Sequence, residues 1–149
     1  MSHDIGLTHV ALPVRDLDVS IAFYEKYAGM RVVHRRREET GGGVAWVSDG
    51  TRPFAVVLLE VTAVEHPLRP SAHLGVGCAS RAEVDRLCAL ARVEKRLAMG
   101  PTDSDGPAGY WALISDPDGH TLEISHGQQV GLVIEGATVS GTPPSRGRT

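Results

Sequence analysis

Cysteine is scarce in this sequence, and neither sign of charge is in large excess. Two cysteines among 149 residues cannot form a disulfide framework, and their spacing fits no zinc motif. We therefore expect both thiols to be reduced, as in a cytoplasmic protein. The formal net charge is only −3, so no strongly basic surface predicts a nucleic acid or an anionic membrane as a partner.

Long hydrophobic runs are also missing. No apolar stretch approaches the roughly 20 residues that a membrane-spanning helix needs. The first ten residues, MSHDIGLTHV, lack the basic and apolar regions of a secretory signal. Hydrophobic residues make up 42% of the chain and charged residues 22%, which is ordinary for a globular protein. We expect a cytoplasmic protein with a small-molecule substrate and no affinity for membranes.

A strand–helix–strand–strand–strand order is present, and it occurs twice. Alternating and helical hydrophobic periodicity predicts the elements of the first unit at 7–14, 15–30, 31–39, 44–48 and 54–61. The same patterns predict the second unit at 73–79, 80–95, 95–100, 110–115 and 120–125. The repeat predicts one domain over residues 1–127, made of two modules at about 5–62 and 72–127.

Two segments are expected to be irregular. Residues 100–109 are rich in Gly, Pro and Asp, so we predict a loop there that is suited to act as a lid. Residues 128–149 turn to Gly, Thr, Ser and Pro, and we predict a C-terminal tail that is largely disordered after a short apolar contact. His34 and the three arginines after it resemble a solvated strand end.

Strand alternation places three chemically active side chains on equivalent faces. His9, His73 and Glu123 each alternate with aliphatic residues in their predicted strands. If the aliphatic faces pack on the two helices, all three side chains point to the opposite, concave side. Two imidazoles and a carboxylate are a ligand set for Fe(II), Mn(II), Ni(II) or Zn(II). The alternative for each residue alone is a hydrogen-bonded histidine or a solvent-facing glutamate.

Two motifs resemble those of the vicinal oxygen chelate superfamily. They are H-V-x-L-x-V-x-D-L-x-x-S-x-x-F-Y at 9–24 and DPDG-x-x-x-E ending at Glu123. The superfamily includes glyoxalase I, bleomycin-resistance proteins, fosfomycin-resistance enzymes, methylmalonyl-CoA epimerases and extradiol dioxygenases. The resemblance covers about 5–127 and implies an α+β fold whose two βαβββ modules form an eight-stranded, partly open curved sheet. It also implies a homodimer, with His9, His73 and Glu123 as metal ligands.

The chain differs from some members of the superfamily at the position of a fourth protein ligand to the metal. Members similar to glyoxalase I carry Glu or Gln on the last strand of the first module. Here the matching positions, Val56 or Leu58, are apolar, and Glu60 serves only if the strand end bends inward. The pattern favours three protein ligands, the arrangement associated with Fe(II) oxygen chemistry.

Extradiol-type dioxygenation is therefore the first reaction to expect from the resemblance. A glyoxalase-like lyase or isomerase, a fosfomycin-type transferase and a non-catalytic drug-binding protein are the alternatives. Tyr110, His120 and His126 lie near the second-module strands and are candidates for an acid or base beside the metal. A turn hydrogen bond is the competing role for His120.

Overall fold

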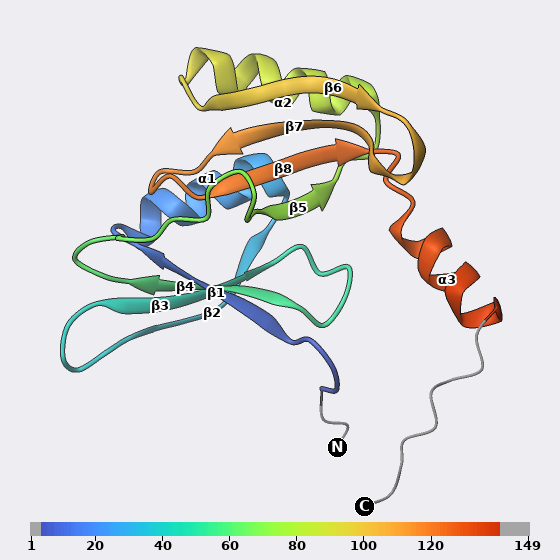
Figure 1. Cartoon of the computed structure of the whole chain (residues 1–149). Coiled ribbons are helices and arrows are strands. Elements are labelled where there is room, and N and C mark those ends of the chain that lie inside the picture. Colours follow the sequence, from blue (N-terminus) through green and yellow to red (C-terminus); the bar gives the residue numbers. More distant parts are fainter. Residues whose placement is uncertain (1–3, 141–149) are drawn as a thin grey trace, which may run out of the picture.

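The computed structural model describes residues 4–140. Its first module contains β1 (His9–Val14), α1 (Leu17–Ala28), β2 (Arg31–Arg37), β3 (Gly43–Ser48) and β4 (Ala55–Glu60). Its second contains β5 (Leu74–Gly77), α2 (Arg81–Val93), β6 (Leu97–Ser104), a 3₁₀ turn (Gly106–Ala108), β7 (Gly109–Ser115) and β8 (Thr121–His126). The first sheet has the order β1-β4-β3-β2 and the second the order β5-β8-β7-β6 (Figure 1). The predicted repeat is confirmed, since the two orders are equivalent.

Helices α1 and α2 begin at residues suited to that position, and α1 also ends at one. The Asp16 side chain accepts from the Val19 amide at the start of α1, and Gly29 ends that helix in the left-handed conformation at φ 62°. At the start of α2 the Ser80 hydroxyl accepts from the Glu83 amide, as its spacing from Glu83 predicts. Each helix packs on the sheet of its own module.

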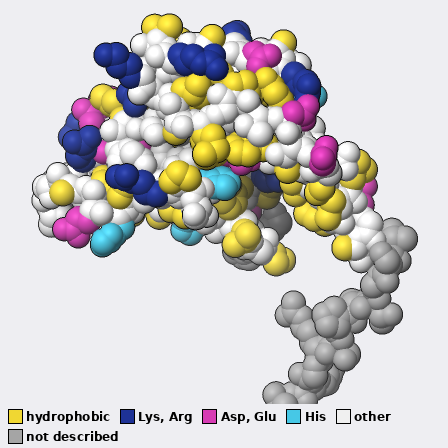
Figure 2. All heavy atoms as spheres, turned by 45° about the horizontal axis from the view of Figure 1, so that its top comes forward, with side chains coloured by type: hydrophobic (Ala, Val, Ile, Leu, Met, Phe, Trp, Pro, Cys, Tyr) yellow, Lys and Arg dark blue, Asp and Glu magenta, His cyan; other side chains and the backbone are white. Residues whose placement is uncertain are grey.

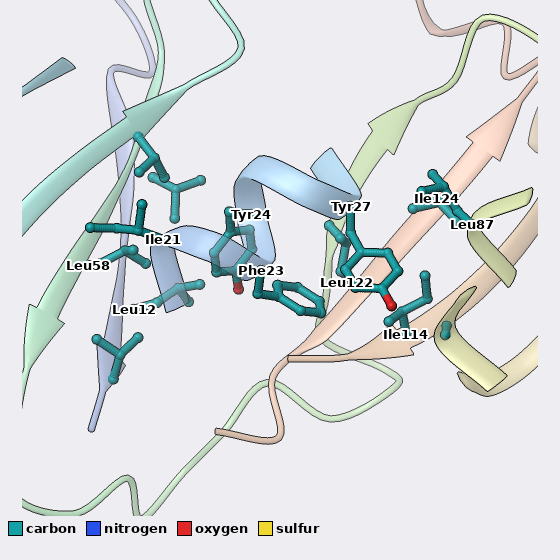
Figure 3. Packing of buried hydrophobic residues seen from close by; sticks show 14 of the residues in the cluster. Leu12, Ile21, Phe23, Tyr24, Tyr27, Leu58, Leu87, Ile114, Leu122 and Ile124 are labelled. Carbon is teal, nitrogen blue, oxygen red and sulfur yellow. The ribbon is translucent and has the colours of Figure 1, made fainter. Parts of the chain in front are cut away.

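One hydrophobic core joins the two modules. The α1 side chains Phe23, Tyr24 and Tyr27 extend between the first sheet and the strands of the second (Figure 3). They meet buried aliphatic residues from both sheets and from α2: Leu12, Leu58, Leu87, Ile114, Leu122 and Ile124. These are the aliphatic faces that strand alternation predicted. The opposite face of each sheet, here called its open face, carries the alternating positions.

The DPDG turn docks the second module on the first. Asp116 is buried, and its Oδ1 accepts from the amides of Asp118 and His120 while its Oδ2 accepts from the Tyr24 hydroxyl. Burial and the facing Asp116 carboxylate raise the pKa of Tyr24 well above its ordinary value, so the hydroxyl keeps its proton and donates. Asp118 in turn accepts from Arg15, which directly follows β1. The turn that starts β8 is thus fixed from both modules.

The prediction of a loop over residues 100–109 is wrong for 100–104, where β6 continues to Ser104, whereas a 3₁₀ turn follows at Gly106–Ala108. Pro101 is tolerated because β6 lies at the edge of its sheet, where a missing amide donor breaks no ladder. The register is irregular between Met99 and Thr102. Gly100 passes so close to β7 that a Cβ there would lie 2.9 Å from the Trp111 carbonyl oxygen. Little of this segment is free to act as a lid.

The start of the predicted tail is helical. Residues Val130–Ser140 form α3, which projects from the body of the protein (Figure 1). Hydrophobic side chains gather on the segment that leads into the grey tail in Figure 2, and four of α3 are exposed: Val130, Leu132, Val133 and Ile134. The rest of the expected disorder, 141–149, lies outside the described residues. Within 4–140, none of the helices has the length and hydropathy that a membrane crossing requires.

Candidate metal centre

His73, which directly precedes β5, and Glu123 of β8 lie together at the second sheet. The His73 Nε2 is 3.5 Å from the Glu123 Oε2, with the two side chains 34% and 14% exposed. Glu123 is on β8, where its partner in register is Gly75 of β5. A Cβ at Gly75 would lie 3.9 Å from the Glu123 Oε1, in ordinary van der Waals contact, so the two positions are direct neighbours on this face. A carboxylate this poorly exposed needs a donor or a cation to offset its lost hydration.

The ring of His73 is oriented by the backbone. Its Nδ1 lies 2.8 Å from the carbonyl oxygen of Pro70. A carbonyl only accepts hydrogen bonds, so Nδ1 carries a proton, and in the neutral ring the lone pair is on Nε2, the nitrogen that faces Glu123. Histidines that ligate metals are commonly held by such a bond from the other ring nitrogen. His73 is therefore prepared to donate a lone pair at the open face.

His9 stands apart from this pair. It begins β1, opposite Ala55 of β4, and its Nδ1 lies 2.9 Å from the Thr8 hydroxyl. Its side chain is exposed on the open face of the first sheet. Among residues 4–140 no three or more His, Cys, Asp and Glu side chains come close enough to hold a metal ion. One chain brings together two of the three predicted ligands, His73 and Glu123, but not His9.

The register of β4 determines whether Glu60 faces the same side of the first sheet as His9. Val14 is its partner on β1, and Val14 is fully buried in the core. Glu60 therefore lies on the core side of the first sheet, opposite to His9. Val56 and Leu58 share that side and are buried, so the positions that the sequence matched to a fourth ligand do not face His9. The β4 residues on the side of His9 are also apolar: Ala55, Val57 and Leu59.

Tyr110 and His126 lie on the opposite face of the second sheet from Glu123. They are register partners on β7 and β8, three positions along each strand from the pairing of Leu113 and Glu123, and an odd number of positions reverses the face. The Tyr110 hydroxyl donates to Asp85 of α2, which raises the pKa of Tyr110. His126 donates from Nδ1 to the carbonyl oxygen of Cys78. Both side chains contact the segment around α2 rather than the open face.

His120 is a buried link between the modules. Its Nδ1 accepts from the Leu68 amide at 3.0 Å, and its Nε2 donates to the Pro13 carbonyl oxygen at 2.7 Å. Both ring nitrogens are therefore used, and the ring is only 1% exposed. This geometry gives His120 a structural role, although its ring bonds are to Leu68 and Pro13 rather than within the turn.

Strand alternation alone does not predict the contacts of two residues near the open faces, Gln128 and His34. Gln128 follows β8, in the segment expected to be disordered, yet its Nε2 donates to the Glu123 Oε1 at 2.6 Å. His34, expected to be a solvated strand end, contacts Trp46 edge to face with ring centroids 5.0 Å apart. The registers His34–Trp46, Trp46–Val57 and Ala11–Val57 place that aromatic pair on the same face as His9.

A cavity of about 700 Å³ reaches neighbours of the metal pair, although His73 and Glu123 are not among the residues that line it. Gly75, the register partner of Glu123, and Gln128, which donates to Glu123, are among the residues that line this cavity. Arg52 and Asp49 supply charges in the lining. The remaining wall is mainly apolar and includes Met30, Val47, Phe54, Val56, Leu74 and Val76. Its volume and lining are typical of sites for small molecules.

Comparison with known proteins adds sequence relatives and a shared fold. A family profile described as "Glyoxalase/Bleomycin resistance protein/Dioxygenase superfamily" matches residues 6–124. An uncharacterized Pseudomonas aeruginosa protein, PA2024, is 37% identical over 128 residues, which cover 84% of this chain and 91% of that one. A probable lactoylglutathione lyase of Vibrio parahaemolyticus is 28% identical, covering 87% and 96%.

Among solved structures, the fosfomycin resistance protein FosX of Listeria monocytogenes has a similar fold. It aligns with a TM-score of 0.66 at 17% identity, over 89% of this chain and 99% of that chain. At this identity the likeness concerns the fold alone.

Proposed function

The chain belongs to the Glyoxalase/Bleomycin resistance protein/Dioxygenase superfamily, and from that premise we propose that it is a metal-dependent enzyme acting on a small oxygen-bearing molecule. The observation that carries the proposal is the pairing of His73 Nε2 with Glu123 Oε2 at 3.5 Å on an open sheet face. Superfamily members are mostly metal-dependent enzymes, and FosX was crystallised with Mn(II).

The residues present fit a divalent cation. An oriented imidazole lone pair and a carboxylate of low exposure are donors that Fe(II), Mn(II), Ni(II) and Zn(II) all accept. The His73–Pro70 bond fixes the tautomer before any ion arrives. Fe(II) is our first choice, because a set of two histidines and one carboxylate leaves positions open for substrate.

The third ligand in this proposal is His9 of a second copy of the chain. Residues 4–140 of one chain offer no third His, Cys, Asp or Glu beside the pair. His9 is exposed on the open face of the other sheet, and within residues 4–140 it is not grouped with Glu123. Two-fold symmetric association of the two open faces would bring His9 of each copy to the pair of the other. The proposed enzyme is accordingly a homodimer with shared sites.

Beyond the metal ligands, the proposed reaction needs residues that bind and orient the substrate. A divalent cation bound at this site would act as a Lewis acid on two neighbouring oxygens of the substrate. The apolar wall of the cavity would bind the body of the substrate and exclude water from it, with Arg52 available to balance negative charge. Gly75 lines the cavity and is a direct neighbour of Glu123.

Extradiol-type ring cleavage is our first choice of reaction. The support is the apolar character of β4 on the side of His9, which limits the protein ligands to three. A lyase or isomerase reaction is the second choice, favoured by the name of the Vibrio relative, a probable lactoylglutathione lyase. A binding protein without catalysis is the outcome if no metal binds.

Metal analysis of protein purified without chelator tests the proposal. Wild-type protein should carry a divalent metal in stoichiometric amount, and His73→Ala and Glu123→Ala should lose it. His66→Ala removes an exposed histidine from the connection before β5 and is the matched control. Negligible metal in the wild type, or full metal in both ligand variants, contradicts the proposal.

Oxygen uptake with a panel of catechols then separates the two reactions. Protein loaded anaerobically with Fe(II) should consume oxygen with at least one catechol and produce a ring-opened product. Metal-loaded protein that is silent with every catechol but converts a hemithioacetal would replace ring cleavage by the lyase reaction.

A further inference from the structure

The two oxygens of the Glu123 carboxylate are used differently. Oε2 lies 3.5 Å from the His73 Nε2, whereas Oε1 accepts from the Gln128 Nε2 at 2.6 Å. Gln128 therefore occupies one oxygen and leaves the other toward His73. An amide can do this without adding charge, so it orients the carboxylate but does not neutralise it.

The position of Gln128 is built into the backbone. Gly127 turns the chain after β8 with φ 83°, a conformation that favours glycine. The segment then passes close to Gly109 at the start of β7. A Cβ at Gly109 would lie 2.5 Å from the His126 carbonyl oxygen and 2.9 Å from the Gln128 amide nitrogen. The Gln129 amide donates to the Pro107 carbonyl oxygen at 3.1 Å. Gln128 thus leaves a clamped turn rather than a free tail.

We propose that Gln128 is a positioning residue for the metal ligand Glu123, holding Oε1 so that Oε2 is presented beside His73. This inference rests on the proposed function, because it assumes that Glu123 binds a metal. Since Gln128 also lines the cavity, it connects the substrate space to the ligand carboxylate. A molecule in that cavity contacts the side chain that sets the carboxylate's orientation.

The test is a titration with Co(II), followed by absorption. Gln128→Met keeps the length of the side chain and removes its donor, and Gln129→Met makes the same change at the exposed neighbouring residue. We expect Gln128→Met to weaken Co(II) binding by about 10- to 100-fold, the range found when a hydrogen-bond partner of a metal ligand is lost. Its Co(II) spectrum should also change, which a loss of stability alone would not produce.

Three outcomes of the titration distinguish the role of Gln128 from the existence of the metal centre. Weaker binding with an altered spectrum for Gln128→Met, beside wild-type behaviour of Gln129→Met, supports the assignment. Equal affinity and an identical spectrum in Gln128→Met overturn it while the metal centre stands. Failure of the wild-type protein to bind Co(II), Mn(II), Zn(II) or Fe(II) overturns the metal centre, and the role of Gln128 with it.

Discussion

Replacing Tyr24 by phenylalanine should weaken the contact that docks the two modules. The Tyr24 side chain is 1% exposed, and its hydroxyl donates at 2.9 Å to Asp116, which is 3% exposed. Removing the hydroxyl deprives a buried carboxylate oxygen of its donor. Hydrogen bonds to charged groups contribute about 1.5–3 kcal/mol, so we expect the free energy of unfolding to fall by about that amount.

Tyr27→Phe is the matched control, one turn further along α1. The Tyr27 hydroxyl also donates to a carboxylate, Glu94, at 2.7 Å. That carboxylate is 26% exposed and is paired with Lys26 and Arg96 as well. Water and the two cations compensate for the lost bond, so we expect a loss of about 0.5–1 kcal/mol.

Urea denaturation at pH 7 measures both losses. With an unchanged dependence on urea concentration, a shift of the midpoint reports stability directly. The Tyr24 variant should lose clearly more than the Tyr27 variant. Equal losses in the two variants would refute the reasoning, because the burial of Asp116 would then not determine how much stability is lost with the hydroxyl.

Two further effects follow from charges and backbone geometry. Hydrogen bonds from Lys26 and Tyr27 lower the pKa of Glu94, so its stabilising effect is present at neutral pH and is lost as the pH falls through that lowered pKa. Urea curves should therefore show a difference in stability between Glu94→Gln and wild type at pH 7 that narrows as the pH falls through the titration of Glu94, and a difference that does not narrow in acid would contradict this. Gly100→Ala should lower the free energy of unfolding more than Gly106→Ala does, since both glycines have positive φ but only Gly100 lies against a neighbouring backbone. We expect the Gly106 change to cost about 1 kcal/mol. Equal losses in the two variants would exclude the close approach as a cause.

Strand alternation was sufficient to predict the faces of β1 and β8. A period of two assigns each side chain to one side of the sheet, so Glu123 was placed opposite the core without knowledge of the packing. The repeat of the element order similarly predicted equivalent sheets. Alternation carries no information on how two sheets are placed relative to each other, which is why the separation of His9 from Glu123 was not predicted.

Other misses have local causes. Composition suggested a loop where β6 runs, because Gly100 and Pro101 break ordinary strands, yet an edge strand tolerates both. Gln128 lies beyond the last strand, and its contact with Glu123 depends on the clamp at Gly109. Such contacts arise from a close approach of backbones far apart in sequence, for which neither periodicity nor composition gives a signal.

The central claim is a metal site shared between two copies of the chain. Mixing two variants that each lack a different metal ligand tests it most directly. His9→Ala and Glu123→Ala should each bind no metal alone. In a mixed dimer, one of the two sites receives its His9 and its Glu123 from unmutated positions. Random reassociation of the unfolded and refolded mixture should therefore restore metal to about a quarter of the sites. A mixture that forms heterodimers but binds no metal would contradict the account.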